Sequence, residues 1–555
     1  MFCMKKIYLT FVLMMASQIT CFGGVKKSPI RVTNEMKVEA MQIVKSMPLK
    51  QRITQLIMPA VKMFDKDSAR SQIDKFVGEN QVGGLMFYKG ECTEQIELYN
   101  RAVSESKLPL LVAIDGEWGL EMRLRKTPRF PINMALGAVN DEKLLEEYGE
   151  ETGRQCKRMG INIDFAPVID VNSNPQNPVI GRRAYSDNKE IVAKCGVAYA
   201  LGMEKAGVLS CAKHFPGHGD TNQDSHKTLP TVNRTKKEIY DTELYTFREY
   251  IAAGLNGMMV AHLNVPALDS ISGLCCSISP VIVDGLLRKE MSYDGLVFTD
   301  ALDMKGVTKY QDVAVHALLA GNDILVMPEN FDKCVNDILS AVESGRIQES
   351  LINERCAKVL AYKKAMGINL QPVKSENILA DLRTKECSEL IKKLARKSIT
   401  LVRDNKGISQ KAKGKDVQLI SLGEDENLKL ISLGDTVVTD RDFYRYIDNG
   451  FKHVFAYNSK TSEMPKYDGS KPIVVEVFSP KQKYIDALGK ISKHNNVVVI
   501  FYVTPYNMLK FKDVVNRDNA IICAYEDTYE AQMAAQQLVQ GKGSFEGVMP
   551  VKIDF

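Results

Sequence analysis

Short apolar, β-branched runs alternate with longer segments of helical period from about residue 50 to about residue 330. The short runs predict buried strands and the longer segments predict helices, a pattern typical of a parallel α/β fold. The predicted strands are Ile53–Ala60, Val82–Tyr88, Pro109–Asp115, Ile161–Ile169, Gly207–Lys213, Gly257–Leu263, Leu296–Asp300 and Asp323–Met327. Helices are predicted between them, among them Asp141–Met159, Lys189–Ala206, Lys236–Ala253 and Ser279–Met291. Eight strand and helix units in succession predict a (β/α)8 barrel of the TIM type.

A second α/β region follows the predicted barrel. A helix at Glu386–Arg396 leads into it, and its last helix is expected at Thr528–Val539. Its predicted strands are Ser398–Val402, Val417–Leu422, Val474–Phe478, Val497–Val503, Ala520–Tyr525 and Gly547–Ile553. We therefore expect a barrel domain at 28–366, a linker and connecting helix at 367–396, and a smaller C-terminal domain at 397–555.

The first residues of the chain differ in composition from the rest. Two lysines precede the apolar run Ile7–Ala16, and Cys21–Gly23 offers small residues for cleavage. This order predicts a secretory signal peptide at 1–23 and therefore an exported, periplasmic protein. A lipid-anchored form through Cys21, or an apolar first helix of the fold, are the alternatives. No later stretch of the sequence is apolar over the roughly 18 residues that a membrane span requires.

Composition narrows the classes of function. The 555 residues are 45% hydrophobic and 25% charged, as in ordinary globular proteins of two or more domains. The formal net charge of +5 is not gathered into a run of Lys and Arg, which argues against nucleic acid as a partner. The twelve cysteines form no CxxC pair and are too sparse for a disulfide scaffold. We expect a monomer that needs no cofactor.

A segment rich in Gly and Pro, 213–230, holds three of the chain's seven histidines, namely His214, His218 and His226. Glycines bring no side chain and charged groups are costly to bury, so core packing does not explain this composition. The segment therefore predicts a catalytic loop.

Three interpretations of this loop compete. Imidazoles and carboxylates are metal ligands, but the segment lacks the helical i,i+4 histidine pair that places two ligands on one face. The favoured interpretation is a proton-transfer pair without metal, in which Asp224 fixes the tautomer of His226 and raises its basicity. A solvated loop with chance histidines is the third interpretation.

Asp300 follows directly on the apolar run Leu296–Thr299. Catalytic groups of a (β/α)8 barrel lie where its strands end, so Asp300 is the candidate for a reactive carboxylate. Two other interpretations are that Asp300 caps the next helix, and that Asp303, three residues further along, is the reactive group.

Charged residues also follow other predicted strands. Asp115 ends the third strand, with Arg123 eight residues later and the only tryptophan, Trp118, between them. A tryptophan beside a carboxylate suits a sugar, which has apolar ring faces and a polar rim. A structural salt bridge for Asp115 and a solvated position for Arg123 are the alternatives.

The fourth and fifth strands lead into charged residues as well. Arg183 follows the fourth strand, where it is also compatible with a solvated position, and Lys213 and His214 end the fifth. A lysine at the barrel rim needs a partner, so this pair favours a functional role.

At these residues the sequence resembles the β-N-acetylglucosaminidases of glycoside hydrolase family 3. The string Lys213–Pro230 is similar to the signature of that subgroup, and Phe298-Thr299-Asp300 is similar to the family's nucleophile motif. Ser398–Val402 and Ala524–Val551 resemble the family's C-terminal α/β sandwich domain. The sequence departs from the family at Gly116–Gly119, where many relatives have Gln-Glu-Gly-Gly.

The resemblance implies a retaining exo-enzyme that removes terminal N-acetylglucosamine by double displacement. It implies Asp300 as nucleophile and His226, paired with Asp224, as acid/base. The positions that it implies for holding the sugar are Asp115, Arg123, Arg183, Lys213 and His214. Cell-wall muropeptides are the expected substrate, beside other glycans with N-acetylglucosamine. A phosphorylase, another family 3 β-glycosidase and a non-catalytic glycan-binding protein are the alternatives.

Overall fold

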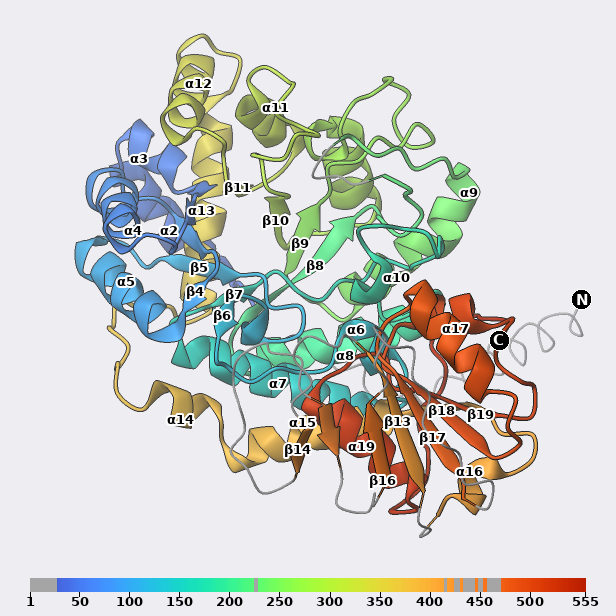
Figure 1. The fold of residues 1–555 in the computed structure, drawn as a ribbon. Coiled ribbons are helices and arrows are strands. Elements are labelled where there is room, and N and C mark those ends of the chain that lie inside the picture. Colours follow the sequence, from blue (N-terminus) through green and yellow to red (C-terminus); the bar gives the residue numbers. More distant parts are fainter. Residues whose placement is uncertain are drawn as a thin grey trace, which may run out of the picture.

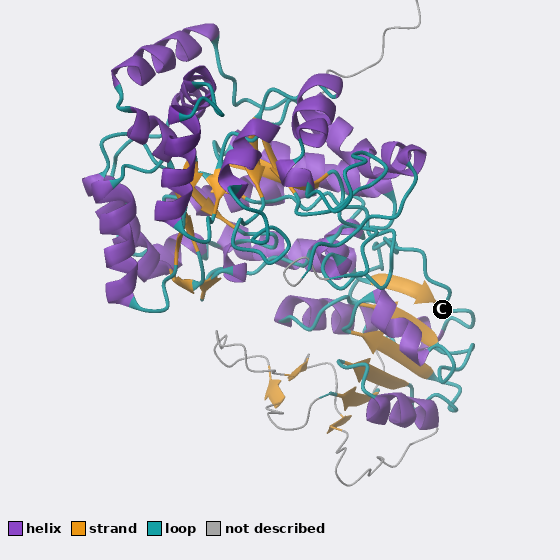
Figure 2. Cartoon of the chain, turned by 90° about the horizontal axis from the view of Figure 1, so that it is seen from above, coloured by secondary structure: helices purple, strands orange, loops and turns teal. Residues whose placement is uncertain are grey.

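The computed structural model describes residues 27–223, 228–413, 417–423, 430–432, 445–447, 453–456 and 471–555. In its larger part, short parallel strands form an inner ring and helices lie outside them (Figures 1 and 2). The strands of the ring are β1 (Ile57–Met58), β2 (Ala60–Val61), β3 (Gly84–Phe87), β5 (Leu111–Ile114), β7 (Ile163–Asp164), β8 (Leu209–Phe215), β9 (Gly257–Val260), β10 (Leu296–Thr299) and β11 (Leu325–Val326).

The strands pair in chain order and close on themselves. β2, β3, β5, β7, β8, β9 and β10 are successive neighbours, and β11 pairs with β1. A bridge between Phe298 and Ile324 joins β10 to the start of β11. β1 and β2 share one strand position and are separated only by Pro59, so eight parallel positions complete the predicted (β/α)8 barrel.

Helices of the outer layer follow the strands. The predicted helices at Asp141–Met159 and Lys189–Ala206 are α7 and α8, and their first turns are capped by Asp141 and Asn188, whose side chains accept the N–H groups of the third helical residues. The helices around the ring are α2 (Asn34–Ser46), α4 (Lys66–Ile73), α5 (Cys92–Glu105), α7 (Glu142–Arg158), α8 (Lys189–Lys205), α10 (Leu244–Ala252), η6 (Val281–Glu290), α11 (Val313–Ala320), α12 (Phe331–Glu343) and α13 (Glu349–Ala365).

Two predicted elements of the barrel have other bounds. The first strand was expected from Ile53, but α3 occupies Leu49–Thr54 and the strand begins at Ile57. A short apolar run does not distinguish a buried strand from a buried helix end, which explains the difference. The helix expected at Lys236–Ala253 is divided into α9 (Lys236–Glu238), the π-helical segment η4 (Ile239–Glu243) and α10.

The C-terminal domain is a mixed sheet between helices, as predicted for an α/β sandwich. Its strand order is β12-β19-β18-β17-β13-β16, with only β12 antiparallel to its neighbour. Helix α17 (Gln482–Ile491) packs on one face, and α16 (Ile408–Lys411) and α19 (Tyr529–Val539) pack on the other. The strands are β12 (Thr400–Arg403), β13 (Gln418–Leu422), β16 (His453–Ala456), β17 (Ile473–Val477), β18 (Val497–Phe501) and β19 (Ala520–Cys523), besides the separate pair β14 (Leu430–Ser432) and β15 (Arg445–Ile447).

The prediction of a strand at Gly547–Ile553 is wrong. This segment is extended but belongs to no sheet, and it lies against the barrel instead. The N–H of Val548 donates to the carbonyl of Ala138 at 3.1 Å, and the N–H of Lys552 donates to Asp187 at 2.8 Å. Pro550 has no N–H to contribute to a ladder, so the alternating pattern serves a contact between domains.

The two domains share a hydrophobic core. Ile132, Met134, Ala135 and Ala138, which lie on and beside α6 (Asn133–Gly137) of the barrel, pack with the inner face of the C-terminal sheet and with α17. Figure 1 shows α6 beside the C-terminal domain. The domains therefore meet through buried apolar residues, so we expect them to keep a fixed arrangement.

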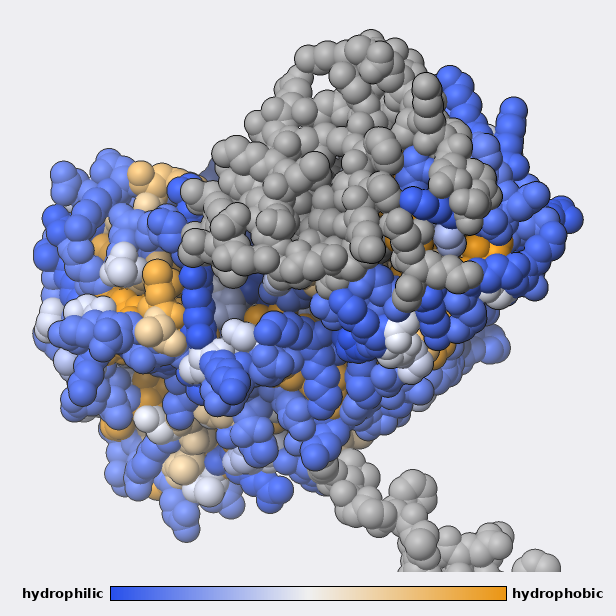
Figure 3. Space-filling view, turned by 60° about the horizontal axis from the view of Figure 1, so that its bottom comes forward, coloured by the Kyte–Doolittle hydropathy of each residue, from blue (hydrophilic) through white to orange (hydrophobic). Residues whose placement is uncertain are grey.

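The surface and the cysteines are those of an ordinary globular protein, as the composition predicts. The face seen in Figure 3 is mainly hydrophilic, with small hydrophobic areas between the charged residues. All ten cysteines in the part of the chain that the structure describes are buried thiols. Among the helices of the described residues, none combines the length and the apolar character of a membrane span.

Candidate active site

A cavity of about 670 Å3 opens at the carboxyl ends of the barrel strands. In this architecture the catalytic groups are found at that end. The cavity collects side chains from the loops after seven of the eight strand positions. Those of the predicted site residues that line it are Asp115, Arg123, Arg183, Lys213, His214 and Asp300.

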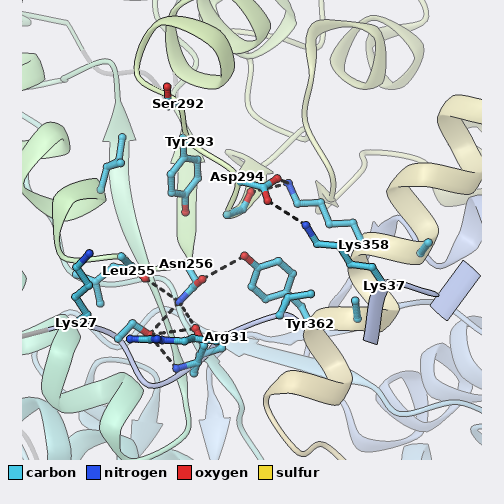
Figure 4. A pocket seen from close by; sticks show the side chains of 18 of the residues that line it. Lys27, Arg31, Lys37, Leu255, Asn256, Ser292, Tyr293, Asp294, Lys358 and Tyr362 are labelled. Atoms are coloured by element: carbon cyan, nitrogen blue, oxygen red, sulfur yellow. Dashed lines mark hydrogen bonds and ion pairs between the residues drawn. The ribbon is translucent and has the colours of Figure 1, made fainter. Parts of the chain in front are cut away.

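A second hollow, of about 700 Å3, lies near the opposite end of the strands (Figure 4). Asn256 directly precedes β9, and its side-chain amide donates to Ser28 at 3.0 Å while its oxygen accepts from Tyr362 at 3.2 Å. Lys358 lies 3.7 Å from Asp294. These polar groups are paired with one another, and the amino ends of barrel strands serve stability, so this hollow is not the candidate active site.

Lys213 is the centre of a buried group of charges. Its ammonium lies 2.8 Å from a carboxylate oxygen of Asp115 and 2.9 Å from one of Glu117. Arg183 forms two bonds to Glu117, at 2.9 and 2.7 Å, and Arg123 donates to Asp115 at 2.6 Å. Three cations and two carboxylates therefore fix one another, which satisfies the requirement that buried charges be paired.

This pairing determines the ionisation of the site. Burial alone would raise the pKa of Asp115, but attraction by Lys213 and Arg123 outweighs it and lowers the pKa to about 2. Burial opposes the charge of Lys213 in the same way, and the carboxylates of Asp115 and Glu117 outweigh it and raise its pKa. All of these groups are charged at neutral pH, so the cavity offers fixed donors and acceptors to a polyhydroxylated ligand.

His214 presents one ring nitrogen to the cavity. Its Nδ1 lies 2.7 Å from Asp170, and a carboxylate only accepts, so Nδ1 carries a proton. Its Nε2 lies 3.4 Å from a guanidinium nitrogen of Arg183. Asp170 also accepts the backbone N–H of His218 at 2.7 Å and thereby holds the start of the loop that follows β8.

Asp300 follows β10 directly and is half-buried in the cavity. One carboxylate oxygen accepts the N–H of Ala301 at 2.8 Å. Burial opposes its charge, but His262, His214 and this hydrogen bond together lower its pKa. Asp303 is exposed at the cavity mouth, and burial of part of its carboxyl raises its pKa. Of the two carboxylates, Asp300 is the better positioned and the more strongly ionised.

Of two further expectations, one is not tested by the described residues and one is not met at this cavity. Asp224 and His226, predicted as the acid/base pair, lie outside the described residues, so their pairing stays a prediction. Trp118 does not line the cavity and packs against the C-terminal core, with the guanidinium of Arg129 6.0 Å from its ring centre. The residue before Trp118, Glu117, lines the cavity instead.

Sequence reasoning gave no role to Glu117, Asp170 and His262. Glu117 and Asp170 hold the charged side chains just described, and His262 lies behind Asp300, with Nε2 2.9 Å from the carbonyl of Ala301. Each of the three lies within two residues of a predicted strand end. That position was the available signal, because carboxyl ends of the strands converge on one face.

The described residues hold no group of three or more His, Cys, Asp or Glu side chains arranged for a metal ion. The cavity instead combines fixed cations, fixed carboxylates and a carboxylate at the end of β10. Such a set can bind the hydroxyls of a sugar and attack a carbon bearing a leaving group.

Comparison with known proteins identifies the family of this site. Residues 48–362 match the model described as glycosyl hydrolase family 3 N terminal domain. The chain belongs to glycosyl hydrolase family 3. The matched range covers all strands of the barrel and all residues of the cavity that are named above.

Several relatives of this family 3 chain carry related names. A Beta-hexosaminidase A of Pseudoalteromonas piscicida is 33% identical over 327 residues, which are 53% of this chain and 55% of that protein. A Beta-hexosaminidase of Methylococcus capsulatus is 33% identical over 51% of this chain and 86% of its own length. The chain thus spans little more than half the length of the former relative.

A solved structure extends the likeness to both domains. It is titled as a glycoside hydrolase family 3 beta-N-acetylglucosaminidase from Paenibacillus, with a TM-score of 0.73 and 28% identity. The match covers 91% of this family 3 chain and 99% of that chain.

Proposed function

We propose that this family 3 chain is a retaining exo-β-N-acetylglucosaminidase. The observation that carries the proposal is the cavity at the carboxyl end of the barrel, in which the Asp300 carboxylate faces a fixed set of charged groups around Lys213. The names of the relatives and of the similar structure support the same activity.

The proposed reaction has two steps. A carboxylate oxygen of Asp300 attacks the anomeric carbon, the bond to the leaving oxygen breaks, and His226 gives that oxygen a proton. A water then gives a proton to His226 and attacks the anomeric carbon, which releases the sugar and restores the Asp300 carboxylate. Asp224 is the proposed partner that keeps the imidazole in the required tautomer.

The residues of the cavity have separate proposed roles in this reaction. Asp115 and Nε2 of His214 accept hydrogen bonds from sugar hydroxyls, while Arg183 and Lys213 donate to hydroxyl or amide oxygens. The lowered pKa of Asp300 supports its role, because a nucleophile must be ionised at working pH. Arg123 holds Asp115 in place through their 2.6 Å contact.

Export to the periplasm, with N-acetylglucosamine-containing muropeptides of the cell wall as substrate, is part of the proposal. The predicted signal peptide at 1–23 supports export. Detection of the mature protein in a periplasmic extract, and release of N-acetylglucosamine from purified muropeptides, test these two points.

The decisive experiment is hydrolysis of a chromogenic β-N-acetylglucosaminide. We expect activity for the wild type and far weaker hydrolysis of the matching β-glucoside. Asp300→Asn should lower kcat by roughly 1,000-fold or more, as removal of a catalytic group does in other enzymes. A covalent sugar on Asp300, trapped with a slow substrate, would identify the nucleophile. Full activity of Asp300→Asn contradicts the proposal.

The same assay in phosphate buffer separates hydrolysis from phosphorolysis. An imidazole as acid/base places no second anion beside the nucleophile, which lowers the electrostatic barrier to phosphate as the acceptor. Free N-acetylglucosamine as the product supports the hydrolase, and the sugar phosphate would make the chain a phosphorylase.

A further inference from the structure

His262 lies just after β9, beside the strand that leads to Asp300. Its ring is buried, and it is not one of the residues that line the cavity. Any part that it takes in the reaction is therefore exerted through a neighbour. A polar ring inside the barrel is also costly unless its nitrogens are satisfied.

Both ring nitrogens of His262 have partners. Nε2 lies 2.9 Å from the carbonyl oxygen of Ala301, and Nδ1 lies 2.8 Å from the hydroxyl of Ser277. A carbonyl oxygen only accepts, so Nε2 carries the proton and donates it. The hydroxyl of Ser277 can donate to Nδ1 of a neutral ring or accept from Nδ1 of a protonated one, so in either state the two partners fix the ring orientation.

Ser277 is itself held from behind. Its carbonyl accepts a hydrogen bond from the side chain of Asn322 at 2.8 Å, and Asn322, like Ser277, is fully buried. The sulfur of Cys275 lies 3.3 Å from the Ser277 hydroxyl. A buried polar chain thus runs from Asn322 through Ser277 and His262 to Ala301.

Ala301 links this chain to the nucleophile proposed above. Its N–H donates to the carboxylate of Asp300 at 2.8 Å, and its carbonyl accepts from His262. Both backbone polar groups of the residue after Asp300 are therefore bound. A rotation of this turn would break the bond to His262 and turn the carboxylate at the same time.

We propose that His262 is a positioning residue for Asp300, acting through the carbonyl of Ala301. The inference rests on the proposed function, because it concerns the orientation of the attacking carboxylate. Attack requires the carboxylate to be placed to within about half an ångström, and such precision needs supporting residues whose own positions are fixed. His262 supplies that support from inside the barrel without touching the sugar.

The test compares steady-state kinetics of His262 variants on the chromogenic β-N-acetylglucosaminide. His262→Ala should lower kcat about 10- to 100-fold with KM changed less than twofold, since misplacement by about 1 Å can cost 100-fold. His262→Gln retains an N–H donor of similar reach and should recover most of the loss. Equal losses in both variants would show that the donor is not what matters.

A double-mutant cycle tests the route through Ser277. Ser277→Ala should lower kcat a few-fold alone and add nothing in the background of His262→Ala, because Ser277 acts only through the ring. Additive effects overturn the proposal. If His262→Ala does not fold, His262→Gln and Ser277→Ala decide it.

His316→Ala is the matched control, since His316 is exposed on α11. It should leave kcat unchanged. A wild type without activity would refute the proposed function, whereas an active wild type with full kcat in His262→Ala would refute this inference alone.

Discussion

Glu117 is the residue on which the geometry of the cavity depends most. It is buried, it binds Arg183 with both carboxylate oxygens, and it shares Lys213 with Asp115. Attraction by these two cations lowers its pKa against the effect of burial. Removal of one member from such a buried set leaves an unpaired charge, which typically costs about 3–5 kcal/mol. Structural and binding roles therefore coincide in the same side chains.

His218 couples the loop after β8 to pH. Burial is the main cause that lowers the pKa of His218 to about 4, and repulsion from His214 is the second. The unfolded chain binds this proton near pH 6.5, so the free energy of unfolding is highest above pH 6.5 and falls as pH decreases toward 4. We expect the titration of His218 to contribute on the order of 3 kcal/mol to the free energy of unfolding above pH 6.5.

Urea unfolding of the wild type and of His218→Gln at pH 6.5 and 4.5 measures this contribution. The variant should lose less stability between the two values, because the titrating group is gone. His316→Gln, altered at an exposed position, should follow the wild type. Identical pH dependence in His218→Gln and wild type would show that His218 is not responsible.

At the scale of elements, α7 and α8 pack unusually closely through glycines. A Cβ atom at Gly202 would lie 2.0 Å from the carbonyl oxygen of Glu146, and one at Gly149 would lie 2.0 Å from that of Tyr199. These are backbone atoms, which cannot move aside as a flexible side chain does. Helix α8 also contacts β7, because the hydroxyl of Tyr199 donates to Asp164 at 2.9 Å, and the loop after β7 carries Asp170 and Arg183.

Gly202→Ala should therefore destabilise the protein by about 2 kcal/mol, although alanine has the higher helix propensity by about 1 kcal/mol. Chemical denaturation measures the change. Gly285→Ala is the matched control, because a Cβ there meets only one atom, at 3.6 Å. The control should be neutral or slightly stabilising. Unchanged stability of Gly202→Ala would show that the two helices separate without cost.

At the scale of the whole molecule, the C-terminal domain supports loops of the active site. The side chain of Asn172 donates to the hydroxyl of Tyr506 at 2.9 Å and accepts the N–H of Gly181 at 3.1 Å. Gly181 opens the short helix η3 (Gly181–Arg183) that ends at Arg183. The C-terminal domain therefore fixes Arg183 indirectly, although its described residues do not line the cavity.

Tyr506→Phe removes the acceptor for Asn172. We expect KM for the β-N-acetylglucosaminide to rise two- to fivefold, roughly the effect of losing about 1 kcal/mol of support for Arg183, with kcat nearly unchanged. Steady-state kinetics measures both constants. Tyr245→Phe, on the barrel surface, is the control and should leave both constants unchanged. Unchanged KM in Tyr506→Phe would show that the domain contact does not reach the site.

The pattern of the sequence was sufficient for the barrel. Apolar runs and helical periods repeat eight times, and parallel strands joined by helices have few ways to close. The candidates Asp115, Arg183, Lys213, His214 and Asp300 could be chosen because each lies at the end of a predicted strand or after it, and the barrel brings strand ends together. Asp224 and His226 rest on the sequence alone.

Pairings between distant residues were decided only by the tertiary structure. Trp118 packs on the second domain and Gly547–Ile553 lies along the barrel, because the partners of both are far away in the chain. The position of Glu117 near a strand end could be read from the sequence, but its pairing with Arg183, 66 residues later, appears only in the folded chain. Local sequence determines periodicity and strand ends, whereas the choice of partner for a charge or an apolar face depends on which surfaces folding brings together.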